Sequence, residues 1–170
     1  EQFAVRRGSG GAGAHRGGDG TIRRIRFCAP MTAAMLANRR STAPFGLHGG
    51  ANGKAGANRV ERLDGGVETL SATAQVELAT GDVFVIETPG GGGYGDPLER
   101  DPEAVRQDVY DRRVTVLMAH QQYVVVPQEP GLSVDQEATQ RLRTTLRAQR
   151  VEALRPTQEN VKRDGTSGKG

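Results

Sequence analysis

Short runs in which apolar and polar positions alternate fill the first half of the chain and predict β-strands. Residues 21–27 place Ile, basic and Phe side chains close to a period of two, and residues 67–70 and 73–78 follow the same pattern. Residues 83–86 form a compact apolar run, which is typical of a buried strand. Glycine-containing turn sequences separate these runs, because glycine accepts a positive φ without steric cost.

Residues 31–36 leave two interpretations open. Their Ala and Met content favours a helix, whereas the short length of the run and its neighbours favour a strand. The single cysteine, Cys28, lies just before them in an apolar strand-like run, so a buried thiol is expected. One cysteine excludes an internal disulfide and a cysteine-based zinc cluster.

After Pro97 the pattern becomes helical. Asp101 supplies a side-chain acceptor at an N-cap, and Pro102 follows at the first helical position. Val105 and Val109 are four residues apart and therefore share one face of the predicted helix.

A further helix is predicted to begin at Ser133, with Gln136 three residues later completing a capping box. Acidic residues lie in its first turn and arginines follow, which matches the helix dipole. Its predicted apolar stripe consists of Val134, Ala138, Leu142 and Leu146.

The distribution of glycine divides the chain into two parts. Twenty of the 24 glycines precede Asp96, so we place a boundary close to Pro97. We expect a glycine-rich β domain of short strands over residues 1–97, a helical tail over 98–155 with two or three helices, and disorder over 156–170, which are polar and lack periodicity. The predicted fold class is mainly β, and α+β overall.

The composition is thin for a core that stands alone. Hydrophobic residues make up 35% and aromatic residues 4% of the chain, and there is no Trp. The strongest contributors to apolar burial are therefore scarce, and a partner or the remainder of a larger protein is expected to supply what is missing. The sequence contains neither a long apolar segment nor a signal-like N-terminus, so we expect a cytoplasmic setting and no membrane partner.

Positive charge is concentrated near the N-terminus. Within the first 40 residues the only anions are Glu1 and Asp19. The arginines of this stretch are Arg6, Arg7, Arg16, Arg23, Arg24, Arg26, Arg39 and Arg40. The C-terminal third mixes signs, and neither an RNA-binding aromatic signature nor a helix-turn-helix pattern accompanies the arginines, so nucleic acid is not an expected partner.

Three glycine-rich loops, residues 7–20, 46–56 and 88–97, lie between predicted strands. A dinucleotide fingerprint requires a helix after the glycines, whereas a strand follows the first loop. A phosphate-binding P-loop requires Gly-Lys-Ser/Thr, and residues 53–55 read Gly-Lys-Ala. Glycine runs are retained where the backbone must approach something closely, so two roles stay open: packing or inter-subunit contact, and direct lining of an active site.

Polar side chains in these loops are the candidates for chemistry. Arg16 could bind a carboxylate or phosphate with two hydrogen bonds, but we favour an ion pair with Asp19 that shapes the loop. His48 could act as a base or ligand, although a lone loop histidine is more often neither. The three histidines do not have metal-site spacing, no metal ligand is assigned, and the catalytic residues are unknown. The residues expected to lie near a substrate are Arg16, Gly17, Gly18, Asp19, His48, Gly91, Gly92 and Tyr94.

The three loops also carry a family resemblance. The blocks RRGSGGAGAHRGGDGTIRRIRF, NRRSTAPFGLHGGANGKAGAN and LATGDVFVIETPGGGGYGDPLERDPEAV resemble, in order and spacing, the C-terminal region of hydantoinase B/5-oxoprolinase proteins over residues 3–109. Two departures are Ala14 and His15, where relatives often carry a further basic residue, and residues 114–122, which are more apolar than the usual tail helix.

The resemblance implies a part of an ATP-dependent cyclic-amide hydrolase of the 5-oxoprolinase or N-methylhydantoinase type, inactive alone. It implies as partners the remainder of the B-type half, an A-type ATPase and a small cyclic amide. It also implies ATP and a divalent metal in the full complex, neither bound by this chain alone. Two alternatives remain: a structural module that joins the A and B halves, and a part of a related acetone or acetophenone carboxylase.

Overall fold

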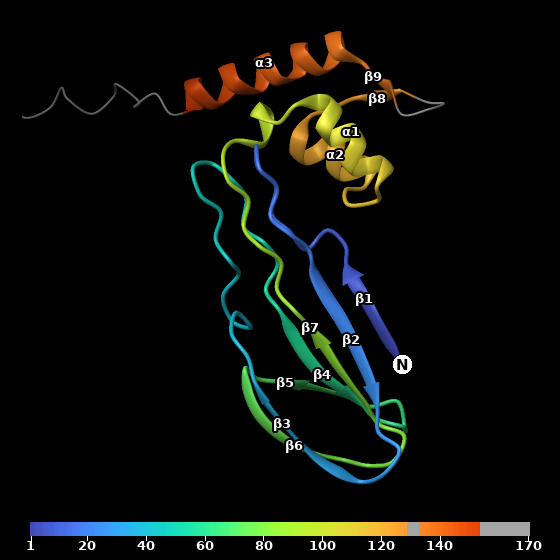
Figure 1. The fold of residues 1–170 in the computed structure, drawn as a ribbon. Helices are drawn as coiled ribbons and strands as arrows, with labels where there is room; N and C mark the ends of the chain where they lie inside the picture. The colour runs from blue at the N-terminus through green and yellow to red at the C-terminus, as the bar shows by residue number, and fades with distance from the viewer. Residues whose placement is uncertain (129–132, 154–170) are drawn as a thin grey trace, which may run out of the picture.

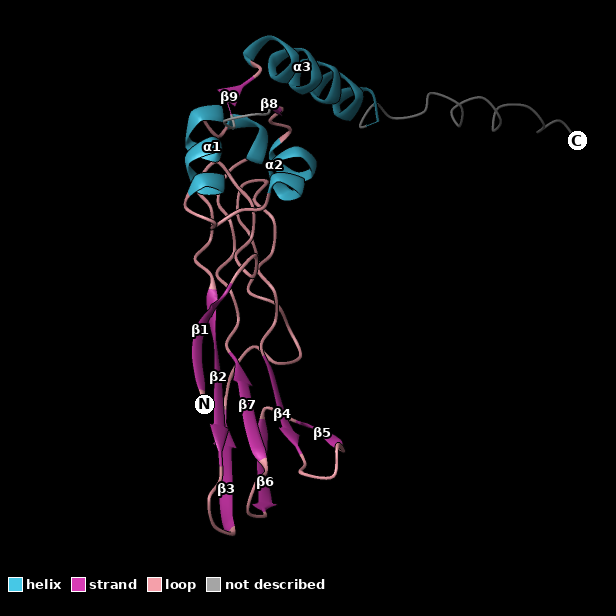
Figure 2. Cartoon of the chain, turned by 90° about the vertical axis from the view of Figure 1, so that its right-hand side faces the viewer, coloured by secondary structure: helices cyan, strands magenta, loops and turns pink. Residues whose placement is uncertain are grey.

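The computed structural model of the protein describes residues 1–128 and 133–153. The strands lie at one end of an elongated molecule, the helices lie at the other, and extended glycine-rich segments connect them (Figure 1). After a quarter turn the same three layers remain visible (Figure 2). The expected α+β fold, rich in strands, is confirmed.

The larger sheet has five antiparallel strands in the order β1-β2-β7-β4-β5. These are β1 (Gln2–Arg6), β2 (Gly20–Arg26), β4 (Ala57–Glu61), β5 (Val67–Leu70) and β7 (Val83–Glu87). The central strand β7 buries Val83, Phe84 and Val85, as its apolar run predicts. The strands predicted near residues 21–27, 67–70 and 83–86 are therefore confirmed, whereas β1 and β4 were not anticipated.

A second, two-stranded sheet pairs β3 (Met31–Leu36) with β6 (Thr73–Leu78). Val76 and Leu78 of β6 are buried against Val60 and Phe84 of the larger sheet, so the two sheets share one apolar cluster. This pairing decides the open question over residues 31–36 in favour of a strand. The expectation of a buried Cys28 is wrong: the thiol is exposed, because β2 ends at Arg26 and Cys28 lies in the connection to β3.

Ion pairs between strands engage Arg6 and Arg24 of the N-terminal arginines. Arg24 on β2 pairs with Glu61 on β4 at 2.5 Å, and Arg59 on β4 pairs with Glu87 on β7 at 2.7 Å. Arg6 on β1 also reaches Glu87, at 2.9 Å. The hydrogen bond from Arg59 is the main cause that lowers the pKa of the Glu87 carboxyl below its ordinary value.

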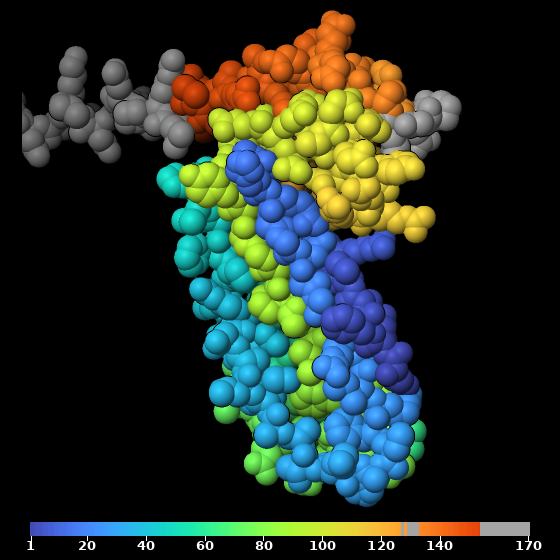
Figure 3. All heavy atoms as spheres, in the orientation of Figure 1, coloured from blue at the N-terminus to red at the C-terminus, as the bar shows by residue number. Residues whose placement is uncertain are grey.

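The helical end begins with a 3₁₀ turn and contains three α-helices among the described residues. Its elements are η1 (Pro97–Glu99), α1 (Pro102–Tyr110), α2 (Val116–Tyr123), β8 (Pro127–Gln128), β9 (Ser133–Val134) and α3 (Gln136–Ala153). Asp101 caps α1 with Pro102 in its first turn, and Val105 and Val109 are buried together, as predicted. Ala12, from the first glycine loop, joins their apolar cluster, so the helices cover one end of the glycine-rich segments (Figure 3).

The predicted start of the last helix is wrong. Ser133 lies in β9, paired with Gln128, and α3 begins at Gln136. The Asp135 carboxylate instead accepts a hydrogen bond from the Ala138 backbone N–H at 2.8 Å. Asp caps a helix as well as Ser does, so the later residue takes the role once Ser133 is used in strand pairing.

The buried face of α3 is polar rather than the predicted apolar stripe. Leu142 is exposed, whereas Thr139 and Arg143 are buried. The Arg143 guanidinium donates to the Tyr123 carbonyl at the end of α2 and to the Arg100 carbonyl after η1, at 2.9 and 2.8 Å. It thereby satisfies carbonyls that the ends of these helices leave without partners.

Residues 154–170, which include the stretch expected to be disordered, lie outside the described residues. Within the described ranges no helix is both long and apolar enough to cross a membrane.

Asp82 ties two turns of the sheet region together and provides a test of this packing. Its carboxylate accepts hydrogen bonds from the backbone N–H groups of Ala79 and Leu63 at 2.9 and 3.1 Å, and from Arg62 at 2.8 Å. The Ala79 hydrogen bond, followed by that from Arg62, holds the pKa of this carboxyl below its ordinary value. A lowered folded-state pKa contributes stability that is present above the unfolded pKa and lost as the pH falls through the folded value.

We therefore expect Asp82→Asn to lower the melting temperature by several degrees at pH 7, since Asn retains the size but not the charge. The difference from wild type should shrink as the pH falls below about 4, the ordinary pKa of Asp. Thermal melts of both proteins from pH 7 to pH 3 measure this difference in melting temperature. The control is Asp64→Asn, in an exposed turn where, among the described residues, the Asp64 carboxylate accepts from the Gly66 N–H alone. A melting-temperature difference between Asp82→Asn and wild type that stays the same from pH 7 to pH 3 would contradict a stabilising role of the ionised Asp82 carboxylate.

Candidate functional site

The three glycine-rich loops meet in one bundle of extended backbone. Gly11 N–H donates to the Gly91 carbonyl at 2.9 Å, and Gly93 N–H donates to the Ala51 carbonyl at 2.9 Å. Ala51 N–H in turn donates to the Ala12 carbonyl at 2.7 Å, which closes the connection among all three loops. Segments that are far apart in sequence are thus held side by side by main-chain hydrogen bonds. We call this arrangement the glycine bundle.

Glycine is required in the glycine bundle because neighbouring backbones occupy the space of a side chain. A Cβ on Gly11 would lie 2.1 Å from the Ala51 carbonyl oxygen, and one on Gly93 would lie 2.0 Å from that of Ala12. A Cβ on Gly92 would lie 1.9 Å from the Phe45 carbonyl oxygen. Of the two roles left open for the loops, packing of backbone against backbone is therefore observed directly.

The ion pair favoured between Arg16 and Asp19 is present and shapes the first loop. Arg16 Nη2 lies 2.5 Å from Asp19 Oδ2, and both side chains are largely buried. Asp19 Oδ1 accepts from the backbone N–H groups of Ser9 and Gly10 at 2.9 and 2.8 Å. Arg16 also donates to the Arg113 carbonyl at 3.1 Å and to the carbonyl of the adjacent Gly17. The donors of Arg16 are thus engaged inside the chain.

A cation-rich pocket of about 270 Å³ lies beside this ion pair. Its walls are His15, Arg16, Gly17, Gly18, Arg100, Asp108 and Arg113. Arg100 pairs with Asp108 at 2.7 Å and donates to the Ala14 carbonyl, while its buried Nε has no partner among the described residues. The carboxylate partners of its three guanidinium groups are Asp19, Asp108 and Asp111. Arg113 is the most loosely held of the three, 3.3 Å from Asp111, so its guanidinium is the group most available to an anion.

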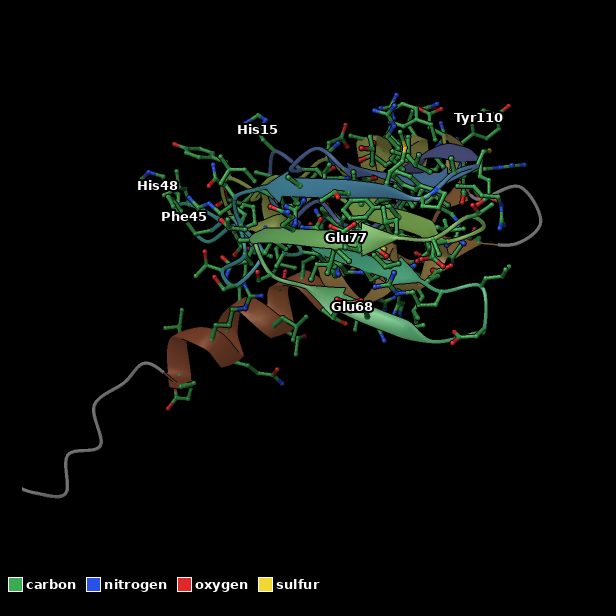
Figure 4. All side chains as sticks on the ribbon, turned by 90° about the horizontal axis from the view of Figure 1, so that it is seen from below. His15, Phe45, His48, Glu68, Glu77 and Tyr110 are labelled. Carbon is green, nitrogen blue, oxygen red and sulfur yellow. The ribbon has the colours of Figure 1, made fainter. Side chains whose placement is uncertain are left out.

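The remaining predicted residues lie on a second surface of the glycine bundle. The ring of Tyr94 lies between two histidines, with centroids 4.9 Å from His48 and 6.1 Å from His15. Both histidines and nearby Phe45 point outward on the same side (Figure 4). Across the described part of the chain, no three His, Cys, Asp or Glu side chains are grouped so that they could hold a metal ion.

The predicted site residues therefore separate into two groups. Arg16, Gly17 and Gly18 line the pocket, Asp19 holds Arg16, and Gly91 N–H bonds to the Gly18 carbonyl at 2.8 Å.

His48 and Tyr94 lie together on the exposed surface, and Gly92 packs against the Phe45 backbone.

Sequence reasoning missed the contribution of the helical tail to the pocket, namely Arg100, Asp108 and Arg113. Asp108 offered a signal: it lies on the same helical face as Val105 and Val109, where a buried carboxylate requires a cationic partner.

The comparisons with known proteins agree with this architecture. The family model described as hydantoinase B/oxoprolinase matches residues 1–97, more than half of the chain and the whole glycine bundle. The chain belongs to this family.

An uncharacterized protein of Methanocaldococcus jannaschii is 35% identical over 144 residues, covering 84% of this chain and 25% of that protein. 5-Oxoprolinase 1 of Arabidopsis thaliana is 43% identical over 97 residues, covering 57% of this chain and 8% of the plant protein. The crystal structure of the ATP-dependent caprolactamase from Pseudomonas jessenii matches with a TM-score of 0.70 at 29% identity, over 85% of this chain and 26% of that one. This chain thus spans between 8% and 26% of these three proteins.

The fit of the glycine bundle can be tested with a matched pair of glycines. Gly92→Ala should lower the free energy of unfolding by about 2 kcal/mol or more, because backbone must move to admit the methyl group. Gly18→Ala should leave stability unchanged or slightly raised, since nothing lies within 4 Å of its Cβ position. Urea unfolding compares the two variants. Equal effects of both would show that close backbone approach is not what glycine provides here.

The role of Arg16 can be tested in the same way. Arg16→Ala leaves the Asp19 carboxylate, only 6% exposed, without its ion-pair partner, so we expect a loss of about 3 kcal/mol. Arg113→Ala is the control, because its side chain is 62% exposed and only its carbonyl contacts Arg16. Thermal denaturation measures both. An unchanged melting temperature for Arg16→Ala, with altered kinetics in an intact relative, would favour substrate binding instead.

Proposed function

We propose that this chain is the C-terminal portion of the B-type half of an ATP-dependent cyclic-amide hydrolase that opens 5-oxoproline or hydantoin rings. The observation that carries the proposal is the family match over the glycine bundle, whose interlocking explains why the three loops occur together. The similarity to a plant 5-oxoprolinase and to an ATP-dependent caprolactamase supports an amide ring as the substrate class.

ATP has a clear chemical purpose in such a reaction. An amide is resonance-stabilised, so its carbon resists attack and its nitrogen is a poor leaving group. Phosphorylation of the amide oxygen removes this resistance at the cost of one ATP. In the proposed complex, ATP and a divalent metal would be held by an A-type ATPase and by the rest of the B-type half.

A structural role within such a complex, joining the A and B halves, is the second candidate. It is favoured by one observation: Asp19, Gly17 and the Arg113 carbonyl engage the donors of Arg16 within the chain. In the enzyme interpretation, the anion-binding capacity of the pocket comes mainly from Arg113, whose guanidinium is exposed. This difference makes Arg113 the residue that separates the two candidates.

The test compares the purified 170-residue chain with the longer B-type polypeptide assembled with its ATPase. We expect no ATP-dependent turnover of 5-oxoproline, hydantoin or caprolactam by the chain alone, and ADP release coupled to ring opening by the assembly. Bicarbonate-dependent consumption of acetone would place the assembly with the carboxylases. Turnover by the isolated chain would contradict the proposal.

Within an active assembly, Arg113→Gln should raise KM several-fold at an unchanged melting temperature if the pocket contacts the substrate. Unchanged KM and kcat for Arg113→Gln, together with dissociation of the halves when Gly92→Ala disrupts the glycine bundle, would support the structural candidate.

A further inference from the structure

A second pocket, which we call the arginine notch, lies between the first turn of the chain and the loop that joins α1 to α2. Its volume is about 350 Å³, within the range of small-molecule sites. In the space-filling view it is the recess between the α1–α2 loop and the N-terminal residues (Figure 3). It shares Arg113 with the pocket beside Arg16, but the other residues that line it have no part in the proposed function.

The floor of the arginine notch is apolar and already ordered. Val109 and Val114 are buried members of the helical core cluster, and Met118 packs against the same cluster. On the other side Gly8, with φ of +69°, brings the first turn so close to Met118 that a Cβ would lie 3.2 Å from its sulfur. The recess is therefore built by contacts between the glycine-rich domain and the helices rather than by a loose surface loop.

The rim carries positive charge that the chain does not neutralise. Arg7 and Arg112 are exposed, and neither forms an ion pair or side-chain hydrogen bond among the described residues. Arg113 approaches Asp111 at 3.3 Å and Asp108 at 3.7 Å, but Asp108 is bound more closely by Arg100 at 2.7 Å. An apolar floor beneath unpaired guanidinium groups matches one ligand chemistry, an anion with an apolar body.

We propose that the arginine notch binds a small organic carboxylate, with the carboxylate between Arg7 and Arg112 and its hydrocarbon part on Val114 and Met118. The guanidinium groups provide planar forks of N–H donors for the carboxylate oxygens. The floor removes the hydrocarbon from water. Neither feature suffices alone, because an exposed ion pair contributes little free energy.

Hexanoate is the probe. Acetate is the control that has the carboxylate but lacks the hydrocarbon chain, and hexanamide is the control that has the chain but lacks the charge. Titration of the full 170-residue chain, followed by NMR of backbone amides, should shift Val114, Val116 and Met118 with hexanoate at concentrations where the other two probes have no effect. The double variant Arg7→Gln/Arg112→Gln should weaken hexanoate binding about tenfold, as expected for loss of charge-assisted hydrogen bonds. The control is Arg23→Gln, since Arg23 lies on β2, is also exposed and forms no ion pair among the described residues.

We expect both variants to fold, because Arg7 and Arg112 form no ion pair or side-chain hydrogen bond within the described part of the chain. Far-ultraviolet circular dichroism of each variant checks this. Val116→Trp, which fills the recess from the half-exposed start of α2, should also abolish the shifts. The proposal is overturned if hexanoate binds no better than hexanamide, or if the double variant binds as wild type does. Protection of the Met118 amide from hydrogen exchange in a larger assembly, without any hexanoate shift, would identify a protein contact and equally overturn it.

Discussion

The contact of main chain with main chain in the glycine bundle is the constraint on which the rest of the structure depends. Each crossing replaces side-chain packing with backbone hydrogen bonds, such as that from Ala51 to Ala12. Buried backbone groups must find partners, and here the partners come from other loops rather than from a helix or a regular sheet. This explains how a chain with 4% aromatic residues spans the distance between two small apolar clusters without one continuous core.

Local physical chemistry made much of the fold predictable from the sequence. Alternating apolar positions predict a strand because successive side chains face opposite sides, and the buried run of β7 needs no other information. Asp101 followed by Pro102 is equally local, since both act on the first helical turn. The glycine loops were predictable only as places of close approach. Which segments approach each other is a property of the tertiary structure.

Features decided by distant partners could not be predicted. β4 contains Asn58, which is buried and accepts from Arg40, so its sequence does not alternate as a strand should. Arg143 replaces Leu142 on the buried side of α3 because carbonyls at the ends of other helices lie beneath it. The pocket beside Arg16 has the same origin, since Arg100, Asp108 and Arg113 come from the helical end of the chain. From the sequence alone, a charged residue is predicted to be exposed, because the partner that would allow its burial is not visible there.

A core made of backbone also decides where side chains can go. Because the interior of the glycine bundle has no room for a Cβ, Phe45, Leu47 and Tyr94 must lie on its surface, where each is about half exposed. In an ordinary domain such residues would fill the core, and exposed apolar clusters mark contacts with other proteins or domains. The same backbone hydrogen bonds that close the interior thus leave an apolar surface on the outside. The chain spans 25% of its archaeal relative, and an exposed apolar surface on a backbone core is suited to contact with another domain or chain.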